Sequence, residues 1–223
     1  SLYFPEPPAR ALDALPAPDY KLAMSAALKL PPAESVDSDP RRDPEYLKIV
    51  EVIRGIKMMS PRPAQPHVFA ANHLHSLLSY RFDRSGGPGD DGPGGWWLLP
   101  EPELHLERND PIVPDIAGWW RERLPYFTQE VGITVAPDWL CEVLSPSTAQ
   151  WDRTAKLPLY AEHGIAHLWL VDPLIRTLET YRLTPEGYLL LKTYGGSQQV
   201  RAQPFEMVPL DLACLWPPQA PAP

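Results

Sequence analysis

Two acidic residues stand in stretches that are otherwise apolar, and their side chains are the ones in this chain best suited to do chemistry. Glu142 lies within WLCEVL, residues 139–144, and Asp115 follows Pro114 in IVPDIAGWW. A carboxylate in an apolar strand is costly unless a partner neutralises it or a cation binds it. Hard divalent cations take carboxylate oxygens from rigid neighbouring strands. The pattern therefore predicts that Asp115 and Glu142 share one metal ion.

Lys156 adds a positive charge close to Glu142. It is expected in the first turn of a helix that begins near Thr154, and this start would also make Pro158 tolerable, since first-turn residues need no N–H partner. A lysine there can orient a water molecule or stabilise negative charge that develops on a phosphate. The alternative is that Glu142 and Lys156 form a structural ion pair, and the residues alone leave both interpretations open.

The elements that must position these side chains form a βαβ-like unit. An apolar run, a stretch with helical spacing that stops at Gly164, and a second apolar run follow one another; they span residues 139–144, 152–163 and 165–171. Alternation along the first strand puts one set of side chains on one face, Asp138, Leu140, Glu142 and Leu144, and the other set on the opposite face, Trp139, Cys141 and Val143.

Further elements are expected on both sides of this unit. A helix is predicted over residues 67–80, and its three histidines lack the spacing of a metal site, so they are interpreted as surface or supporting residues; they are His67, His73 and His75. A strand pair is predicted around Gly55 at 46–59, and two further strands at 96–106 and 112–120, of which the second contains Asp115. A hairpin is predicted at 177–183 and 187–194, and an edge strand at 198–208.

Length and composition favour one domain with irregular ends. The chain has 223 residues, enough for one sizeable core, and many of its 30 prolines lie near the ends or in a few loops. Residues 1–44 are predicted to form a Pro-rich arm with one helix at 20–30, residues 45–216 a single domain, and residues 217–223 a disordered tail.

Charge and cysteine content limit the classes of function. A net charge of −8 argues against a protein that binds DNA through counterion release alone, so a nucleic-acid role needs a local basic patch or a bound metal ion. Two cysteines make no disulfide framework, no apolar stretch reaches membrane-spanning length, and no signal-peptide pattern is present. We expect a soluble, cytoplasmic protein. Four tryptophans exceed what one core needs and predict a homodimer interface; they are Trp96, Trp97, Trp119 and Trp120.

The motifs resemble those of a known nuclease family. Asp115, Glu142 and Lys156, in this order and with these flanking strands, resemble the PD-(D/E)XK nuclease superfamily. Within it, PDWLCEVLSPST, LWLVDP and TLETYRL closely resemble the Uma-two family of endonucleases. The resemblance covers most of the chain from about residue 46 to 216, with MMSP at 58–61, His67 after it, and the closing DLACLW.

This resemblance implies a fold, an activity and roles for single residues. The fold would be a restriction-endonuclease-like α/β core, a mixed central sheet flanked by helices. The activity would be Mg²⁺- or Mn²⁺-dependent hydrolysis of phosphodiester bonds, with nucleic acid, DNA first, as the substrate and a homodimer as the assembly. Asp115 and Glu142 would be metal ligands, Lys156 the catalytic lysine, and Asp138 and His67 would support them from a second layer.

One departure from the family pattern, together with the net charge of −8 and the many tryptophans, supports a different function. Ile56 follows Gly55 where the family usually has glutamate, which would remove an acid from the metal site and leaves Glu51 as the nearest upstream carboxylate. Leu144, where the superfamily places lysine, is not such a departure: the resemblance implies that the Uma-two family also lacks lysine there and supplies it from the helix, as Lys156 would do here. The alternative is therefore a catalytically weak or inactive homodimeric binding or scaffold protein of the same fold. Hydrolysis of a glycoside by two carboxylates is a third candidate, but it lacks a groove signature.

Overall fold

The computed structural model describes residues 48–83, 92–107 and 110–218. The predicted arm at 1–44, its helix at 20–30 and most of the tail at 217–223 lie outside these residues. The domain boundaries stay predictions.

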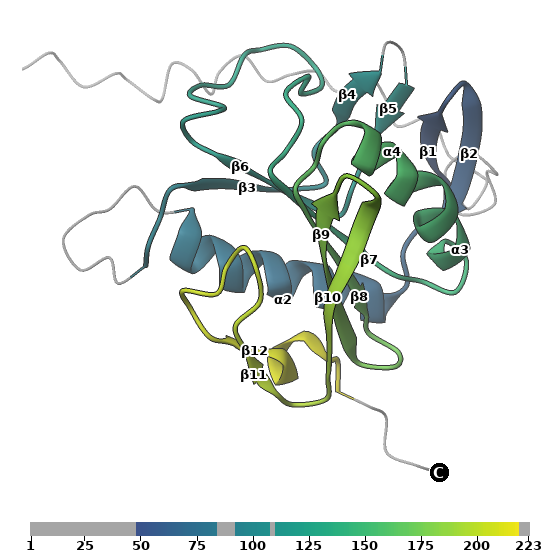
Figure 1. Cartoon of the computed structure of the whole chain (residues 1–223). Coiled ribbons are helices and arrows are strands. Elements are labelled where there is room, and N and C mark those ends of the chain that lie inside the picture. Colours follow the sequence, from purple (N-terminus) through teal and green to yellow (C-terminus); the bar gives the residue numbers. More distant parts are fainter. Residues whose placement is uncertain (1–47, 84–91, 108–109, 219–223) are drawn as a thin grey trace, which may run out of the picture. The chain divides into compact units, whose positions relative to one another are not determined.

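A six-stranded sheet forms the centre of the described chain, with the strand order β10-β9-β8-β7-β6-β3 (Figure 1). Only β7 and β8 pair in parallel and every other neighbouring pair is antiparallel, so the sheet is mixed. The strands are β3 (Trp96–Pro100), β6 (Ile116–Trp120), β7 (Trp139–Val143), β8 (His167–Asp172), β9 (Thr177–Thr184) and β10 (Gly187–Gly195).

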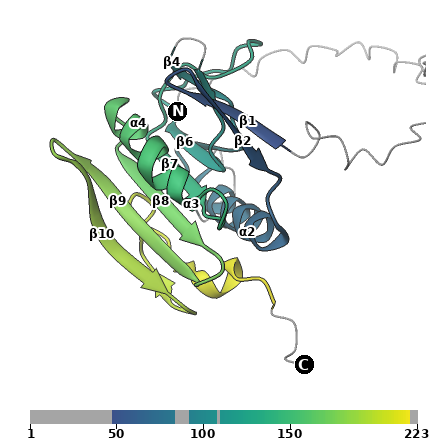
Figure 2. The same cartoon turned by 90° about the vertical axis from the view of Figure 1, so that its right-hand side faces the viewer.

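Helices cover both faces of this sheet (Figure 2). The long helix α2 (Gln65–Phe82) packs on one face through Ala70, Leu74 and Leu78, together with the short 3₁₀ turn η3 (Leu212–Leu215). A second helical segment packs on the other face through Leu159 and Tyr160. Its three parts are α3 (Ala149–Trp151), η2 (Asp152–Lys156) and α4 (Leu157–Glu162). The architecture is the predicted α/β type with a mixed sheet flanked by helices.

Strand β7 and its neighbours confirm the predicted βαβ unit. β7 and β8 are parallel and are connected through α3, η2 and α4. Cys141 and Val143 belong to the core on the α2 side, whereas Leu140 and Leu144 belong to the core on the α4 side. The alternation read from the sequence is therefore correct.

The helical segment begins at Ala149, and the predicted start near Thr154 is wrong. The turn that starts it is closed by Thr148 N and Ala149 N, which donate to Ser145 O at 3.1 and 2.9 Å. Pro158 consequently lies inside the segment. Proline has no N–H to donate and crowds the preceding turn, and here it directly follows the wide π-type turn η2, in which Leu157 N donates to Asp152 O. Such π-bulges interrupt the α ladder and recur at functional sites.

Small paired strands flank the sheet. The predicted pair around Gly55 is confirmed as the antiparallel strands β1 (Lys48–Ile53) and β2 (Ile56–Pro61). The predicted runs 96–106 and 112–120 are each broken, because β4 (Leu104–Glu107) and β5 (Asp110–Ile112) form a separate pair. The predicted edge strand at 198–208 is mostly turns, with only β11 (Gln199–Val200) pairing to β12 (Leu210–Asp211).

The tryptophans are mainly core residues. Trp96 and Trp119 are buried to 1% and 0% exposure, so the prediction that they are surplus interface residues is wrong. Trp96 is buried in the core on the α2 side of the sheet and Trp119 in the core on the α4 side. Trp120 stacks on Trp96 with 4.1 Å between ring centroids and is 44% exposed. No helix in the described part of the chain is long and apolar enough to cross a membrane.

Candidate active site

Asp115 lies in the loop that enters β6, not inside a strand as predicted. The ladder between β6 and β7 pairs Ile116 with Cys141. One step further along this antiparallel register, Asp115 comes opposite Glu142. Asp115 Oδ2 accepts a hydrogen bond of 2.7 Å from Val143 N, which fixes the carboxylate at the carboxyl end of β7.

Glu142 is buried on the α4 face of β7, with 2% exposure. Its Oε1 accepts a hydrogen bond from Lys156 Nζ at 3.2 Å and another from Tyr160 Oη at 2.5 Å. The strand therefore carries a carboxylate into the protein interior, and the helical segment supplies both donors.

Lys156 contacts three carboxylates from three different elements. Its Nζ lies 3.0 Å from Glu51 Oε1, 3.2 Å from Glu142 Oε1 and 3.6 Å from Asp152 Oδ1. All four side chains are no more than 6% exposed. The predicted contact between Lys156 and Glu142 is present, within a larger ionic cluster than the sequence indicated.

Glu51 is the acid that sequence reasoning did not place at the site. It projects from β1, and its Oε1 also accepts a hydrogen bond of 3.1 Å from Val113 N. Ile56, where the family usually has glutamate, is 59% exposed on the same hairpin and does not line the cavity around Lys156. Glu51 thus supplies a carboxylate to the cluster from the hairpin that carries Ile56.

His67 is brought to Asp115 by the first turn of α2. Its Nε2 lies 3.2 Å from Asp115 Oδ1, and its Nδ1 is buried without a hydrogen-bond partner. Helix α2 begins after Ala64 with proline at its N-terminus, a residue that suits a first turn. His73 and His75 do not join this cluster: His73 stacks on Phe69, and His75 Nε2 lies 3.0 Å from Leu98 O.

Asp138 does not lie at the site, so the prediction that it supports the metal ligands is wrong. It precedes β7, at the opposite end from Glu142. Its carboxylate accepts hydrogen bonds from Trp120 N at 2.9 Å and from Arg123 Nη1 at 2.6 Å. Strand direction explains the difference, because residues that share a face can still lie at opposite ends of a strand.

The clustered side chains line one cavity of about 430 Å³. Its wall also includes hydroxyl groups and one cationic side chain, from Ser60, Ser145, Thr148 and Arg62. A smaller cavity of about 200 Å³ adjoins it and shares His67, Glu101 and Asp115 with it. Glu101 has a φ of 46°, a backbone conformation that non-glycine residues adopt rarely and that concentrates at functional sites.

Electrostatics in this cavity are dominated by burial and by an excess of acid. Burial raises the pKa of Glu142 well above its usual range, against the opposing effect of Lys156. Burial raises the pKa of Asp152 in the same way. For Lys156, burial acts to lower the pKa, but the surrounding carboxylates outweigh it and the pKa is raised. Burial also acts to lower the pKa of His67, and the hydrogen bond and charge of Asp115 reverse the direction. The surrounding carboxylates therefore favour the protonated form of Lys156.

The donor set suits a hard divalent cation. Five carboxylates line the cavity against one lysine, one arginine and one histidine, so full ionisation leaves negative charge in excess; these acids are Glu51, Glu101, Asp115, Glu142 and Asp152. Among the residues that the structure describes, no three His, Cys, Asp or Glu side chains converge as a complete metal site. Mg²⁺ does not require one, because it keeps several waters and is usually held by one or two carboxylates together with substrate phosphates.

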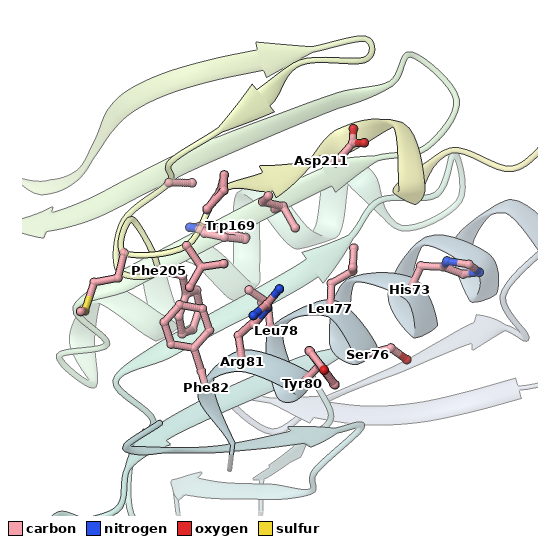
Figure 3. Close-up of a pocket in the computed structure, with 15 residues that line it drawn as sticks. His73, Ser76, Leu77, Leu78, Tyr80, Arg81, Phe82, Trp169, Phe205 and Asp211 are labelled. Carbon is pink, nitrogen blue, oxygen red and sulfur yellow. The ribbon is translucent and has the colours of Figure 1, made fainter. Parts of the chain in front are cut away.

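A larger cavity lies elsewhere, between α2 and residues 202–211 (Figure 3). It measures about 680 Å³, and its inner wall is formed by aromatic side chains, Phe82, Trp169 and Phe205. It contains none of the clustered carboxylates. Volume alone would therefore point away from the titratable groups, and we assign the candidate active site by the chemistry of its lining.

Comparison with known families identifies the family of the chain. The sequence profile of the Uma2 family, described as "Putative restriction endonuclease", matches residues 45–213. The chain belongs to the Uma2 family. No curated protein matches the chain.

A solved structure shares the fold. The chain resembles a protein from Anabaena variabilis ATCC 29413 that is titled a putative nuclease belonging to DUF820, with a TM-score of 0.59 and 22% sequence identity. The match covers 75% of this chain and 89% of the other. The predicted restriction-endonuclease-like α/β fold and the family resemblance are thus confirmed.

Some of the cluster could have been found in the sequence. Asp152, Lys156 and Tyr160 recur every four residues, a spacing that places side chains on one helical face. Glu51 gives a weaker signal, because the hairpin that carries it lies far away in the chain and nothing local indicates that this acid is buried.

Proposed function

We propose that this protein is a metal-dependent endonuclease that hydrolyses phosphodiester bonds in nucleic acid, DNA first. One observation carries the proposal: Asp115, from the loop that enters β6, and Glu142, from β7, line a single cavity beside the buried ammonium of Lys156. An acid such as Glu142, whose pKa is raised by burial and which lies in a cavity beside charged groups, is characteristic of active sites. Membership of the family supports the same reaction.

In this proposal Asp115 and Glu142 hold Mg²⁺ or Mn²⁺. When bound, the ion supplies a Lewis acid for a phosphate oxygen and lowers the pKa of a bound water. His67 donates to, or shares a proton with, Asp115 Oδ1 and so orients that carboxylate, as supporting partners of metal ligands do.

Lys156 acts as a fixed positive charge in this proposal. Because its pKa is raised, the ammonium keeps its proton and cannot serve as a general base. It can donate hydrogen bonds and stabilise the negative charge that develops on the phosphate in the transition state. The buried setting makes this interaction stronger than it would be in water.

Substrate binding also depends on the metal ion. The chain carries a net charge of −8, so association with a polyanion gains little from the protein's overall field. The ion and Arg62, which lines the cavity, provide the local positive charge.

A homodimer in the cytoplasm completes the proposal. The interface we propose includes Trp120, Tyr126 and Phe127, which are 44%, 70% and 48% exposed, because aromatic side chains are enriched at interfaces. Free cysteines at 141 and 214 are compatible with a reducing compartment. A dimeric mass by light scattering at micromolar concentration supports the interface, and a monomeric mass contradicts it.

One observation favours the second candidate, a binding or scaffold protein without activity. Lys156 is engaged by three carboxylates, as a structural ion pair would be. The two functions are separated by incubating the protein with supercoiled plasmid and with single-stranded DNA and RNA, in Mg²⁺, Mn²⁺ or EDTA. The nuclease proposal expects cleavage that requires the metal and is lost in Asp115→Asn. Binding without cleavage at any metal concentration would favour the scaffold.

A further inference from the structure

One face of the β1–β2 hairpin is buried against the rest of the domain, and this face carries Glu51. Glu51 and Ile53 are buried to 4% and 3% exposure, whereas much of β2 is exposed. Ile53 belongs to the apolar core on the α4 side of the sheet. Glu51 instead enters the polar cavity, where its burial is costly unless charged partners compensate for it.

A single oxygen of Glu51 connects two elements of the candidate site. Oε1 lies 3.0 Å from Lys156 Nζ and accepts a hydrogen bond of 3.1 Å from Val113 N. Val113 is two residues before Asp115 in the loop that enters β6. Glu51 therefore ties the helical segment that bears Lys156 to the loop that bears Asp115. Of the three carboxylates around Lys156, it makes the shortest contact.

We propose that Glu51 is a positioning residue that holds the Lys156 ammonium beside the Asp115–Glu142 pair. The proposal rests on the proposed nuclease function. If a cation binds Glu142, the carboxylate of Glu142 becomes a poorer partner for a second cation, and Glu51 is then the anchor that keeps Lys156 in place. The hairpin, which lies outside the central sheet, thus supplies a part of the active site.

The test is a double-mutant cycle between Glu51→Gln and Lys156→Met, with kcat, KM and the half-saturating Mn²⁺ concentration measured for each protein. Glutamine keeps the size and the acceptor oxygen and removes the charge. We expect Glu51→Gln to lower kcat about tenfold, the low end of effects at supporting residues, with KM and the Mn²⁺ requirement unchanged. In the Lys156→Met background the same change should have no further effect, because its target is gone.

Ile53→Val is the matched control. It loosens the same hairpin from the apolar core without contacting Lys156. We expect it to lower the melting temperature and to leave kcat unchanged. An equal fall in kcat for Ile53→Val would show that hairpin stability, and not the position of Lys156, is responsible. Multiplicative effects of Glu51→Gln and Lys156→Met on kcat would show that Glu51 acts independently of Lys156. A raised Mn²⁺ requirement in Glu51→Gln would make Glu51 a metal ligand. Either result would overturn the proposal.

A second readout separates this inference from the proposed function. The ¹⁵Nζ resonance of a buried, ion-paired lysine reports how tightly the ammonium is held. We expect slow hydrogen exchange at Lys156 in the wild-type protein and in Ile53→Val, and fast exchange in Glu51→Gln. Wild-type protein without nuclease activity would remove the proposed function, while unchanged exchange in Glu51→Gln would by itself refute Glu51 as the anchor.

Discussion

The two ends of β7 present carboxylates in opposite circumstances. At the start, Asp138 is matched by two donors, Trp120 N and Arg123 Nη1. At the carboxyl end, Glu142 also accepts from two donors, Lys156 Nζ and Tyr160 Oη, but it lies among other buried acids, and burial raises its pKa. The first arrangement satisfies a charge and stabilises the fold, whereas the second leaves negative charge that a bound cation would neutralise. An acid in an apolar strand becomes a candidate for function when its neighbours are acids as well.

The largest expected effect is the loss of cleavage when a carboxylate at the carboxyl end of β7 is replaced. Replacing Asp115 with Asn or Glu142 with Gln should reduce cleavage about 100-fold or more, since changes at supporting residues of metal sites already cost about 10- to 100-fold. Steady-state cleavage of plasmid DNA in Mn²⁺ measures this. Activity within about threefold of wild type in either variant would remove that residue from the metal site.

Metal ions should stabilise the folded protein by binding at the carboxyl end of β7, beside Glu142. A ligand that binds the native state at 100 times its Kd contributes about 2.7 kcal/mol, which corresponds to roughly 5–10 °C in Tm for a chain of this size. We expect this rise with Mn²⁺ for the wild-type protein and not for Asp115→Asn. Calorimetric melting of the two proteins, with and without Mn²⁺, measures the difference, and equal rises would place the ion elsewhere.

Without metal, the Glu142 end should be a source of instability that grows with pH. The folded-state pKa of Glu142 is raised above its unfolded value, so its contribution to stability is complete below about pH 4 and is lost as pH rises through the folded value. Glu142→Gln cannot ionise, and Glu51 and Asp152 remain as partners of Lys156.

In EDTA we therefore expect Glu142→Gln to melt a few degrees above wild type, with a difference that widens from pH 5 to pH 8, a gain in stability at the cost of function. Melting curves across this range test the sign. A difference that narrows as pH rises would mean that Glu142 is stabilised as the anion, and would return it to the role of a structural ion pair.

The smallest effect is expected at Asp138. Asp138→Ala leaves Trp120 N without its acceptor and should lower the free energy of unfolding by about 1–2 kcal/mol. Cleavage should stay within about twofold of wild type, because Asp138 does not line the cavity. Urea unfolding and the plasmid assay measure both quantities, and a large loss of activity would restore the supporting role that the sequence suggested.

Local patterns in the sequence predicted most of the central sheet and three of the converging groups, Asp115, Glu142 and Lys156. The strand that carries Glu142, its alternation and the parallel partner β8 follow from apolar periodicity. Asp115 was assigned to the interior of a strand, because Ile112 and Ile116 flank it with apolar residues. In the structure, Val113, Pro114 and Asp115 instead form a loop between β5 and β6. Helix α2 was also predictable from its stripe of apolar residues.

Tertiary contacts determined what the sequence could not show. Glu51 reaches Lys156 only because the β1–β2 hairpin folds against a segment more than a hundred residues later in the chain. Trp96 and Trp119 suggested an interface, since nothing local shows that β3 and β6 are covered on both faces. Asp138 shares a predicted face with Glu142, and only the direction of β7 separates them.

The central claim, that Asp115 and Glu142 hold one divalent cation, is tested most directly by diffraction from crystals soaked in Mn²⁺ at the manganese absorption edge. The account predicts an anomalous peak in the cavity, with an oxygen of Asp115 and an oxygen of Glu142 each about 2.0–2.6 Å from it. Saturating Mn²⁺ without a peak there, and with Lys156 Nζ still bound to Glu142 Oε1, would contradict it.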